Sequence, residues 1–238
     1  MKPMMDPDAL AMRSEARAVG VNRVYNFIYG WMAAGLAVSG LVAWMVANAV
    51  ATGSFQLSSG TLIVCLVAEI ALVFALSFAI HKLAPMAAAA LFMVYAALNG
   101  VTLSILLLVY DIGTIQTAFF ATAGTFAAMA VFGTVTKRDL STLGRVCMMA
   151  VIGLIVASLV NVFMRNTGLQ AVICYVGVAA FVGLTAYDAQ KVRELADAAD
   201  RLDAPTVARL GILGALQLYL DFINLFIYLV QILGRSRE

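Results

Sequence analysis

One aspartate stands in the middle of an otherwise apolar stretch near the carboxyl end of the chain. From Leu210 to Leu233, Asp221 is the only ionisable acid. An ionised carboxylate at the centre of a membrane helix costs at least about 2.5–3.5 kcal/mol. Such a residue is kept either because a neighbouring helix hydrogen-bonds to it or because it works as a gate, an ion site or a proton site. Asp221 is therefore the first candidate for function.

A second aspartate, Asp188, ends the preceding apolar stretch, with Lys191 following within one turn. Two carboxylates in contact in a low-dielectric site cannot both ionise cheaply, so they would share a proton and titrate as a pair. Such a pair would be a pH-sensitive latch. It would also be a weak site for Ca²⁺, because this ion takes about six to eight oxygen ligands and two aspartates supply few of them.

The positions of Asp188 and Asp221 raise a difficulty of depth. Judged by the apolar boundaries, Asp221 lies more than about 10 Å deeper in the membrane than Asp188, at about 1.5 Å of helix per residue. The two side chains can meet only if a water-filled cavity opens from the cytoplasm or if the first turns of the last helix lie outside the lipid. Arg209, Gly211 and Gly214 favour the second arrangement.

Further polar residues fall within or beside the apolar stretches. Glu69 lies midway along the second stretch, where it either hydrogen-bonds to an amide such as Asn99 or takes part in an ion pathway. His81 and Lys82 end that stretch as membrane anchors, and they are also the cations best placed to pair with Asp188. Two asparagines are candidates for hydrogen bonds between helices, and four aromatic residues are interpreted as packing or lipid-facing side chains. These residues are Asn161, Asn224, Tyr219, Phe222, Phe226 and Tyr228.

The composition indicates an integral membrane protein. Of the 238 residues, 63% are hydrophobic and 12% are charged, whereas a soluble domain has about 25% charged residues. The net charge of +2 and the short basic clusters do not favour nucleic-acid binding. Three cysteines without a CxxC pair and a single histidine argue against a zinc site, a disulfide framework and a Ser-His-Asp triad. No cofactor is expected.

Seven apolar stretches are long enough to cross a bilayer core of about 30 Å, which needs roughly 20 residues of helix. The chain is thus predicted to be an all-α membrane protein with an arm at 1–26, a seven-helix domain at 27–234 and a tail at 235–238. The predicted spans are 27–51, 61–80, 86–109, 115–136, 146–164, 170–189 and 210–233. The charged stretch after the sixth span favours a helix that continues into the cytoplasm.

The distribution of Lys and Arg predicts the orientation. With seven spans, twelve of these residues fall on the side of the amino terminus and three on the other side. The positive-inside rule therefore places the amino terminus in the cytoplasm and the carboxyl terminus outside. The expected location is the cell (inner) membrane. A last segment that dips into the membrane and returns would put the carboxyl terminus inside instead. Seven full spans are preferred.

Two motifs resemble the Bax inhibitor-1 family in its bacterial form. One is Ala186-Tyr187-Asp188 with Gln190-Lys191, and the other runs from Gly214 to Phe226 around Asp221. The resemblance implies a central seventh helix surrounded by six others. It also implies a pH-sensitive Ca²⁺ leak with Asp188 and Asp221 as the sensor. The family's basic latch on the second span has no arginine here, so that role would fall to His81 or Lys82.

Three functions compete on the sequence alone. The first is the Ca²⁺ leak channel, which is not an enzyme. The second is a regulatory membrane protein that binds a membrane protease or another membrane-protein partner, with structural aspartates. The third is an intramembrane aspartyl protease, but that class needs Gly-x-Gly-Asp, and the chain has Leu218-Tyr219-Leu220-Asp221. A retinal protein is disfavoured because no lysine follows Lys191.

Overall fold

The chain folds into seven long α-helices joined by short turns. The computed structural model describes the backbone of residues 7–235 and the side chains from Val19 onward. The helices are α1 (Pro7–Ala51), α2 (Ser59–Ala79), α3 (Pro85–Val109), α4 (Ile112–Val135), α5 (Ser141–Met164), α6 (Thr167–Ala198) and α7 (Ala204–Arg235). Two short 3₁₀ turns, η1 (Ile80–Lys82) and η2 (Ala199–Arg201), extend α2 and α6.

Side chains in the turns begin several of these helices. Ser58 accepts a hydrogen bond from the amide of Thr61 at the start of α2, and Asp111 accepts one from Thr114 at the start of α4. Asn166 accepts one from Leu169 at the start of α6. The first amides of a helix have no partner within the helix, so such oxygens stabilise its start. Pro85 begins α3 at a position where a missing N–H costs nothing.

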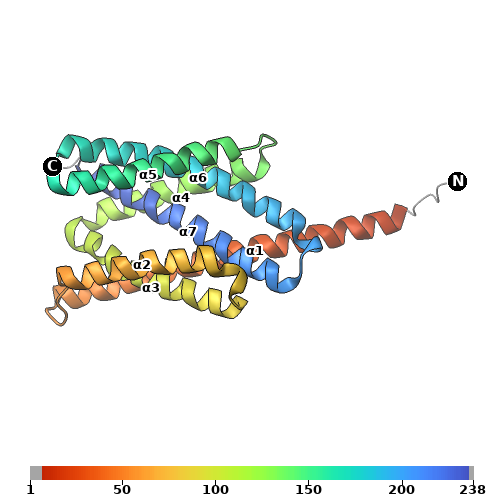
Figure 1. The fold of residues 1–238 in the computed structure, drawn as a ribbon, viewed down its shortest axis with the longest axis horizontal. Helices are drawn as coiled ribbons and strands as arrows, with labels where there is room; N and C mark the ends of the chain where they lie inside the picture. The colour runs from red at the N-terminus through yellow and green to blue at the C-terminus, as the bar shows by residue number, and fades with distance from the viewer. Residues whose placement is uncertain (1–6, 236–238) are drawn as a thin grey trace.

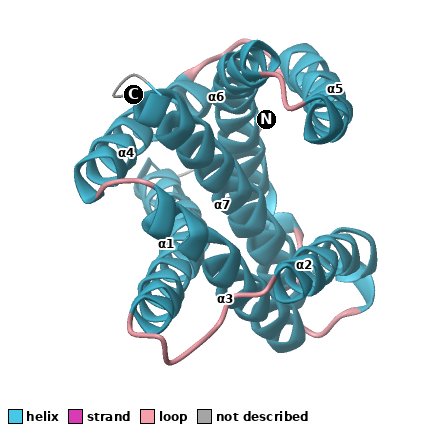
Figure 2. Ribbon diagram, turned by 90° about the vertical axis from the view of Figure 1, so that its left-hand side faces the viewer, coloured by secondary structure: helices cyan, strands magenta, loops and turns pink. Residues whose placement is uncertain are grey.

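Helix α7 occupies the centre of the bundle (Figure 2). It packs directly against α1, α3, α4 and α6, while α2 lies mainly against α3 and α5 against α6. In the most apolar stretch of α7, 61% of the residues are buried, compared with 22% in α2 and 17% in α5. The predicted central position of the last helix is confirmed, with α2 and α5 completing the surrounding layer from outside.

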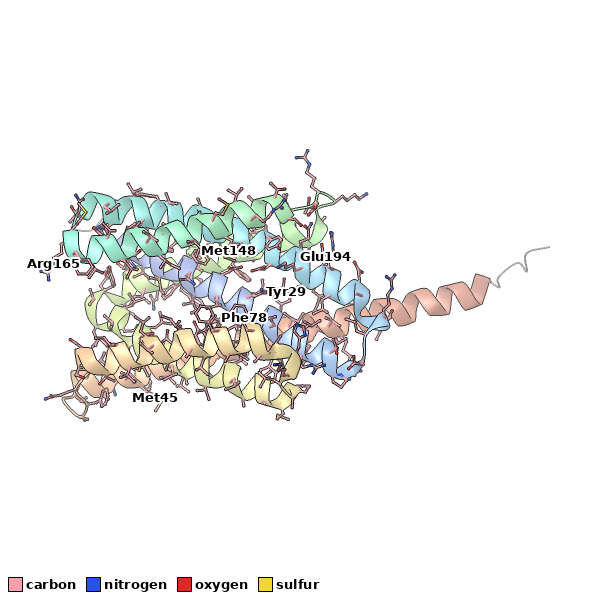
Figure 3. All side chains as sticks on the ribbon, in the orientation of Figure 1. Tyr29, Met45, Phe78, Met148, Arg165 and Glu194 are labelled. Atoms are coloured by element: carbon pink, nitrogen blue, oxygen red, sulfur yellow. The ribbon has the colours of Figure 1, made fainter. Side chains whose placement is uncertain are left out.

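The outward faces of the helices are apolar. Phe78, Met45 and Met148 are 78%, 54% and 51% exposed, and they project from α2, α1 and α5 (Figure 3). Large apolar side chains exposed on this scale are unfavourable in water and favourable in the hydrocarbon core of a membrane. All seven helices are long and apolar enough to cross a membrane. The prediction of an all-α, seven-span membrane protein is confirmed.

The two ends of the described chain lie at opposite ends of the bundle. Helix α1 begins at one end and α7 finishes at the other, and the α6–α7 turn lies toward the end where α1 begins (Figure 1). Helix α7 runs unbroken over 32 residues, so it spans fully and does not turn back. The predicted arm is helical from Pro7, and its first six residues lie outside the described part, as do tail residues 236–238.

Candidate functional site

Asp188 and Asp221 meet inside the bundle. Asp188 lies on α6 and is 8% exposed, and Asp221 lies on α7 and is 3% exposed. Their carboxyl groups are within hydrogen-bonding contact of each other. The structure thus places the two acids that the sequence suggested as a candidate pair in contact, at a site that is almost closed to solvent.

The lengths of α6 and α7 explain why the two acids meet. Beyond Asp188, residues 189–201 continue as helix past the apolar stretch, and residues 204–220 of α7 form a return helix of similar length. Each of these helices has 32 residues, or about 48 Å at 1.5 Å per residue, which exceeds the bilayer core of about 30 Å. Helices of this length favour the second of the two predicted arrangements, in which the first turns of α7 lie outside the lipid.

The contact between the two carboxyl groups depends on a proton. Asp221 Oδ2 is buried and receives no hydrogen bond from a donor group. Ionised carboxylates only accept hydrogen bonds, so two of them repel each other and neither satisfies its neighbour. A single proton on the pair turns the contact into a hydrogen bond. The arrangement can therefore hold one proton and respond electrostatically when that proton leaves.

Two further titratable or charged groups act on the pair. Lys191 is the cation that acts electrostatically on Asp188, and its ammonium lies 4.5 Å from the centre of the Tyr187 ring. The Cys147 thiol of α5 lies close enough to Asp221 to sense its charge. Lys191 lies on the same helix as Asp188, so this cation comes from α6 itself.

Glycines allow α4 and α5 to approach α6 closely around Asp188. A Cβ atom at Gly133 of α4 would overlap the carbonyl oxygen of Ala186. A Cβ atom at Gly144 of α5 would lie 2.5 Å from the Tyr187 ring. Small residues permit such backbone contact between membrane helices. The turn of α6 that carries Asp188 is therefore held between α4 and α5.

Two side chains that follow Asp188 on α6 fasten the α4–α5 loop. Gln190 is 3% exposed, donates to the carbonyl of Arg138 at 2.8 Å, and accepts from the amide of Leu140 at 2.8 Å. Arg193 donates to the carbonyls of Thr134 and Thr136 at 2.9 and 2.7 Å. These bonds satisfy the carbonyls at the end of α4, which lack helical partners. The sequence showed no role for either side chain beyond the place of Gln190 in a motif.

Glu69 lies in a different part of the bundle, facing α3. Its Oε2 accepts a 3.3 Å hydrogen bond from Asn99 Nδ2, and its Oε1 accepts a 3.0 Å bond from Thr102 Oγ1. The predicted hydrogen bond to Asn99 is confirmed. The structure does not bring Glu69 to the aspartate pair.

Tyr219 connects this cluster to the central helix. Its hydroxyl donates to Asn99 Oδ1 at 2.9 Å and lies 2.6 Å from Ser39 Oγ, and the side chain is 0% exposed. On the sequence alone, Tyr219 is predicted to be a packing or lipid-facing residue. That prediction lacks the polar role of the hydroxyl, whose partners lie on α1 and α3. Spacing along α7 alone carries no sign of them.

His81 and Lys82 lie at the surface in η1. The carbonyl oxygen of His81 accepts a 3.1 Å hydrogen bond from Arg209 at the start of α7. Within the described residues, no hydrogen bond or ion pair joins either side chain to Asp188, on which Lys191 acts instead. Their predicted latch role stays a prediction.

The two asparagines that were predicted to bond between helices differ. Asn161 donates a 2.8 Å hydrogen bond to Gln170 on the next helix. The prediction for Asn224 was wrong, because its side chain donates to the carbonyl of Leu220 on its own helix.

Metal-binding capacity at the pair is limited. Among residues with described side chains, no group of three or more His, Cys, Asp or Glu residues is placed to hold a metal ion. A Ca²⁺ ion at the pair would meet two carboxyl groups and would need water or carbonyl oxygens to complete its about six to eight ligands. The pair alone therefore supplies too few oxygen ligands to hold a Ca²⁺ ion firmly.

Two acids in the loops behave differently from the buried pair. Hydrogen bonds from the side chain and backbone of Ser141 hold the pKa of Asp139 below its usual range. Thr206 does the same for Asp203, with its amide 3.1 Å from Asp203 Oδ2. Both loop acids stay ionised well below neutral pH, so neither can report pH changes near neutrality.

Comparison with known families finds one whose profile covers most of the chain. A family profile described as "Inhibitor of apoptosis-promoting Bax1" matches residues 21–238, which is most of the chain and includes both aspartates. The chain belongs to the Bax inhibitor-1 family. Membership covers six of the helices entirely and all of α1 from Val21 onward.

Bacterial members of the Bax inhibitor-1 family are close in sequence. The inner membrane protein YbhL of Escherichia coli K12 is 44% identical over 211 residues, covering 88% of this chain and 90% of YbhL. An uncharacterised protein of Deinococcus radiodurans is 46% identical over 214 residues, covering 88% and 89%. One from Borreliella burgdorferi is 39% identical over 218 residues, covering 91% and 94%. The relatives are thus matched over nearly their whole length.

Proposed function

We propose that this protein is a pH-sensitive calcium leak channel gated by Asp188 and Asp221. The observation that carries the proposal is the contact of these two carboxyl groups, 8% and 3% exposed, between α6 and α7. With one shared proton, the pair holds the two helices together and leaves the site closed. When the proton leaves, the two negative charges repel each other and attract cations. Flux is therefore expected to rise as the pH rises.

The proposed orientation places this gate in the inner membrane with the amino terminus in the cytoplasm. The amino-terminal arm, the turns after α2, α4 and α6, and the helix ends beside these turns share one side and carry twelve of the fifteen Lys and Arg residues. In this orientation the α6–α7 hairpin projects into the cytoplasm. Cytoplasmic pH would then act on the pair through the hairpin.

The test is Ca²⁺ entry into dye-loaded proteoliposomes that contain the pure protein, from about pH 5 to about pH 8. Wild type should show a flux that titrates, and both Asp188→Asn and Asp221→Asn should lose the pH dependence. Asp203→Asn is the matched control, since Asp203 is an acid of the same hairpin that lies in the exposed turn. A flux that titrates equally in all four proteins would refute the proposal.

A regulatory membrane protein with structural aspartates is the alternative, and it predicts no flux in pure liposomes at any pH. The protease alternative is weaker. Helix α7 runs without interruption through Asp221. Because helix continues on both sides of Asp221, an extended substrate strand cannot reach its carboxyl group. Glu69, His81 and Lys82 stay candidates for a latch or pathway, and no contact within the described residues links them to the pair.

A further inference from the structure

A groove separate from the aspartate pair lies between α1, α3, α4 and α7. Its volume is about 340 Å³, at the lower end of the range of about 300–1,000 Å³ for ligand sites. Its walls are almost wholly apolar, with Ser39 and Gln116 as the polar side chains and no charged one. The apolar walls include Leu36, Leu103, Leu107, Ile115, Phe222 and Ile223.

The groove opens toward the lipid. Phe119 and Phe120 of α4, which help line it, are 46% and 72% exposed, and Gly40 of α1 is also exposed. Helices α1 and α4 are neighbours around α7 (Figure 2), yet they do not pack closely against each other as α1 and α3 do. All lining residues fall within the membrane-spanning helices. Hydrocarbon, and not water, therefore meets the mouth of the groove.

The groove belongs to one half of the membrane. Gln116 lies in the first turns of α4, and Gly40 and Ala43 lie in the second half of α1. Both places lie toward the end of the bundle where α7 finishes (Figure 1). The floor is formed by Phe222 and Ile223 of α7, each 6% exposed. A molecule in the groove would thus enter from the leaflet at the carboxyl-terminal end and reach the central helix.

We propose that this groove binds one acyl chain of a membrane lipid from that leaflet. Along α1 the lining runs from Leu36 to Ala43, about 10 Å at 1.5 Å per residue, which suits a linear chain. The absence of charge on the walls matches an aliphatic occupant, and the half-open rim allows the polar headgroup to stay outside near Gln116. The acyl chain would pack against Phe222, Ile223 and Phe226 of α7, which follow Asp221. This binding does not depend on ion conduction.

Photolabelling tests the proposal on the full chain. The protein is reconstituted in vesicles of phosphatidylethanolamine and phosphatidylglycerol with a trace of phospholipid carrying a diazirine in mid-chain. After illumination, labelled peptides are mapped by mass spectrometry. Because Phe222 and Ile223 are buried behind the groove, label on them requires a chain inside it. Exposed residues such as Phe78 of α2 supply the label expected from ordinary lipid contact.

Two glycines on α1 provide a matched pair of variants. Gly40 and Gly30 are both exposed, and a Cβ atom at either meets nothing within 4 Å, so a larger side chain at either position can extend away from the bundle and both Gly40→Phe and Gly30→Phe should fold. Only Gly40 lines the groove. We expect label at residues 222–223 in wild type and in Gly30→Phe, and its loss in Gly40→Phe, with the label on Phe78 unchanged in all three. Absence of label at residues 222–223 in wild type, as when a second copy fills the groove, would overturn the proposal. Its persistence in Gly40→Phe would do so equally.

Discussion

The hydroxyl of Tyr219 donates a 2.9 Å hydrogen bond to Asn99 Oδ1, and this bond ties the central helix to α3 only two residues before Asp221. Asn99 in turn donates to Glu69. The position of the aspartate-bearing helix is therefore fixed in part by a buried polar chain that reaches α2. Such chains specify one arrangement of helices when every member has a partner.

Removing the hydroxyl should loosen this connection. Tyr219→Phe leaves Asn99 Oδ1 without its donor and Ser39 without its nearest hydroxyl partner, so we expect a loss of about 1–3 kcal/mol in stability. Thermal unfolding in detergent measures the change. Tyr175→Phe is the control, because Tyr175 is 63% exposed on the outside of α6. Equal unfolding temperatures for the two variants would contradict the role of the bond.

The variant Glu69→Gln tests whether Glu69 has a structural role or takes part in an ion pathway. Glutamine keeps the size of the side chain and one acceptor oxygen, and the contacts of Glu69 are with Asn99 and Thr102, away from the aspartate pair. We expect Ca²⁺ flux in proteoliposomes to keep its pH midpoint. A flux reduced as strongly as in Asp221→Asn would instead place Glu69 in the ion pathway.

The contact between α4 and α6 should not tolerate even one added methyl group. Gly133→Ala would set a Cβ atom against the Ala186 backbone, which cannot rotate away as a side chain can. We expect a destabilisation of about 1–3 kcal/mol, typical of overpacking, seen as a lower unfolding temperature. Gly124→Ala on the same helix meets nothing within 4 Å and should unfold like wild type.

Gln190 should control the exposure of the α4–α5 loop. Replacing it with alanine frees the amide of Leu140 and the carbonyl of Arg138. We expect hydrogen–deuterium exchange at the Leu140 amide to become faster by roughly tenfold or more, since a lost buried bond is worth about 1–3 kcal/mol. Exchange at the Leu169 amide, capped by Asn166 on the opposite side of the bundle, serves as the internal reference. Unchanged exchange at Leu140 would show that other contacts hold the loop.

Asp203 supplies a prediction about pH. Hydrogen bonds from Thr206 hold the pKa of Asp203 below its usual range. An aspartate with a lower pKa in the folded state than in the unfolded state stabilises the fold when it is ionised. This stabilisation is fully present when the pH is above the unfolded-state pKa of about 3.9, and it is lost as the pH falls through the folded-state pKa. Between about pH 5 and pH 8 the contribution is constant. Asp203→Asn should thus lower stability evenly across this range, without moving the midpoint of any Ca²⁺ flux. A shifted pH midpoint of the flux would instead show that the hairpin turn takes part in pH sensing.

Much of the architecture could be predicted from the sequence because it depends on local properties. Apolar stretches of about 20 residues predict membrane helices directly, and the turns between them were located within a few residues. The helix boundaries differ mainly at charged ends, where α1 begins at Pro7 and α6 continues to Ala198. Charged residues favour helix as readily as apolar ones do, so hydropathy marks the edge of the lipid and not the end of the helix.

The amino-acid sequence by itself determined that this is a seven-helix membrane protein with isolated acids at Asp188 and Asp221, since both follow from composition and from the cost of charge in lipid. Only the tertiary structure decided that these acids touch. Their meeting depends on how far α6 continues past Asp188 before α7 returns to Asp221, and on glycines that let α4 and α5 pack closely around α6. The roles of Tyr219 and Gln190 were likewise decided by partners far away in the chain, which no local pattern encodes.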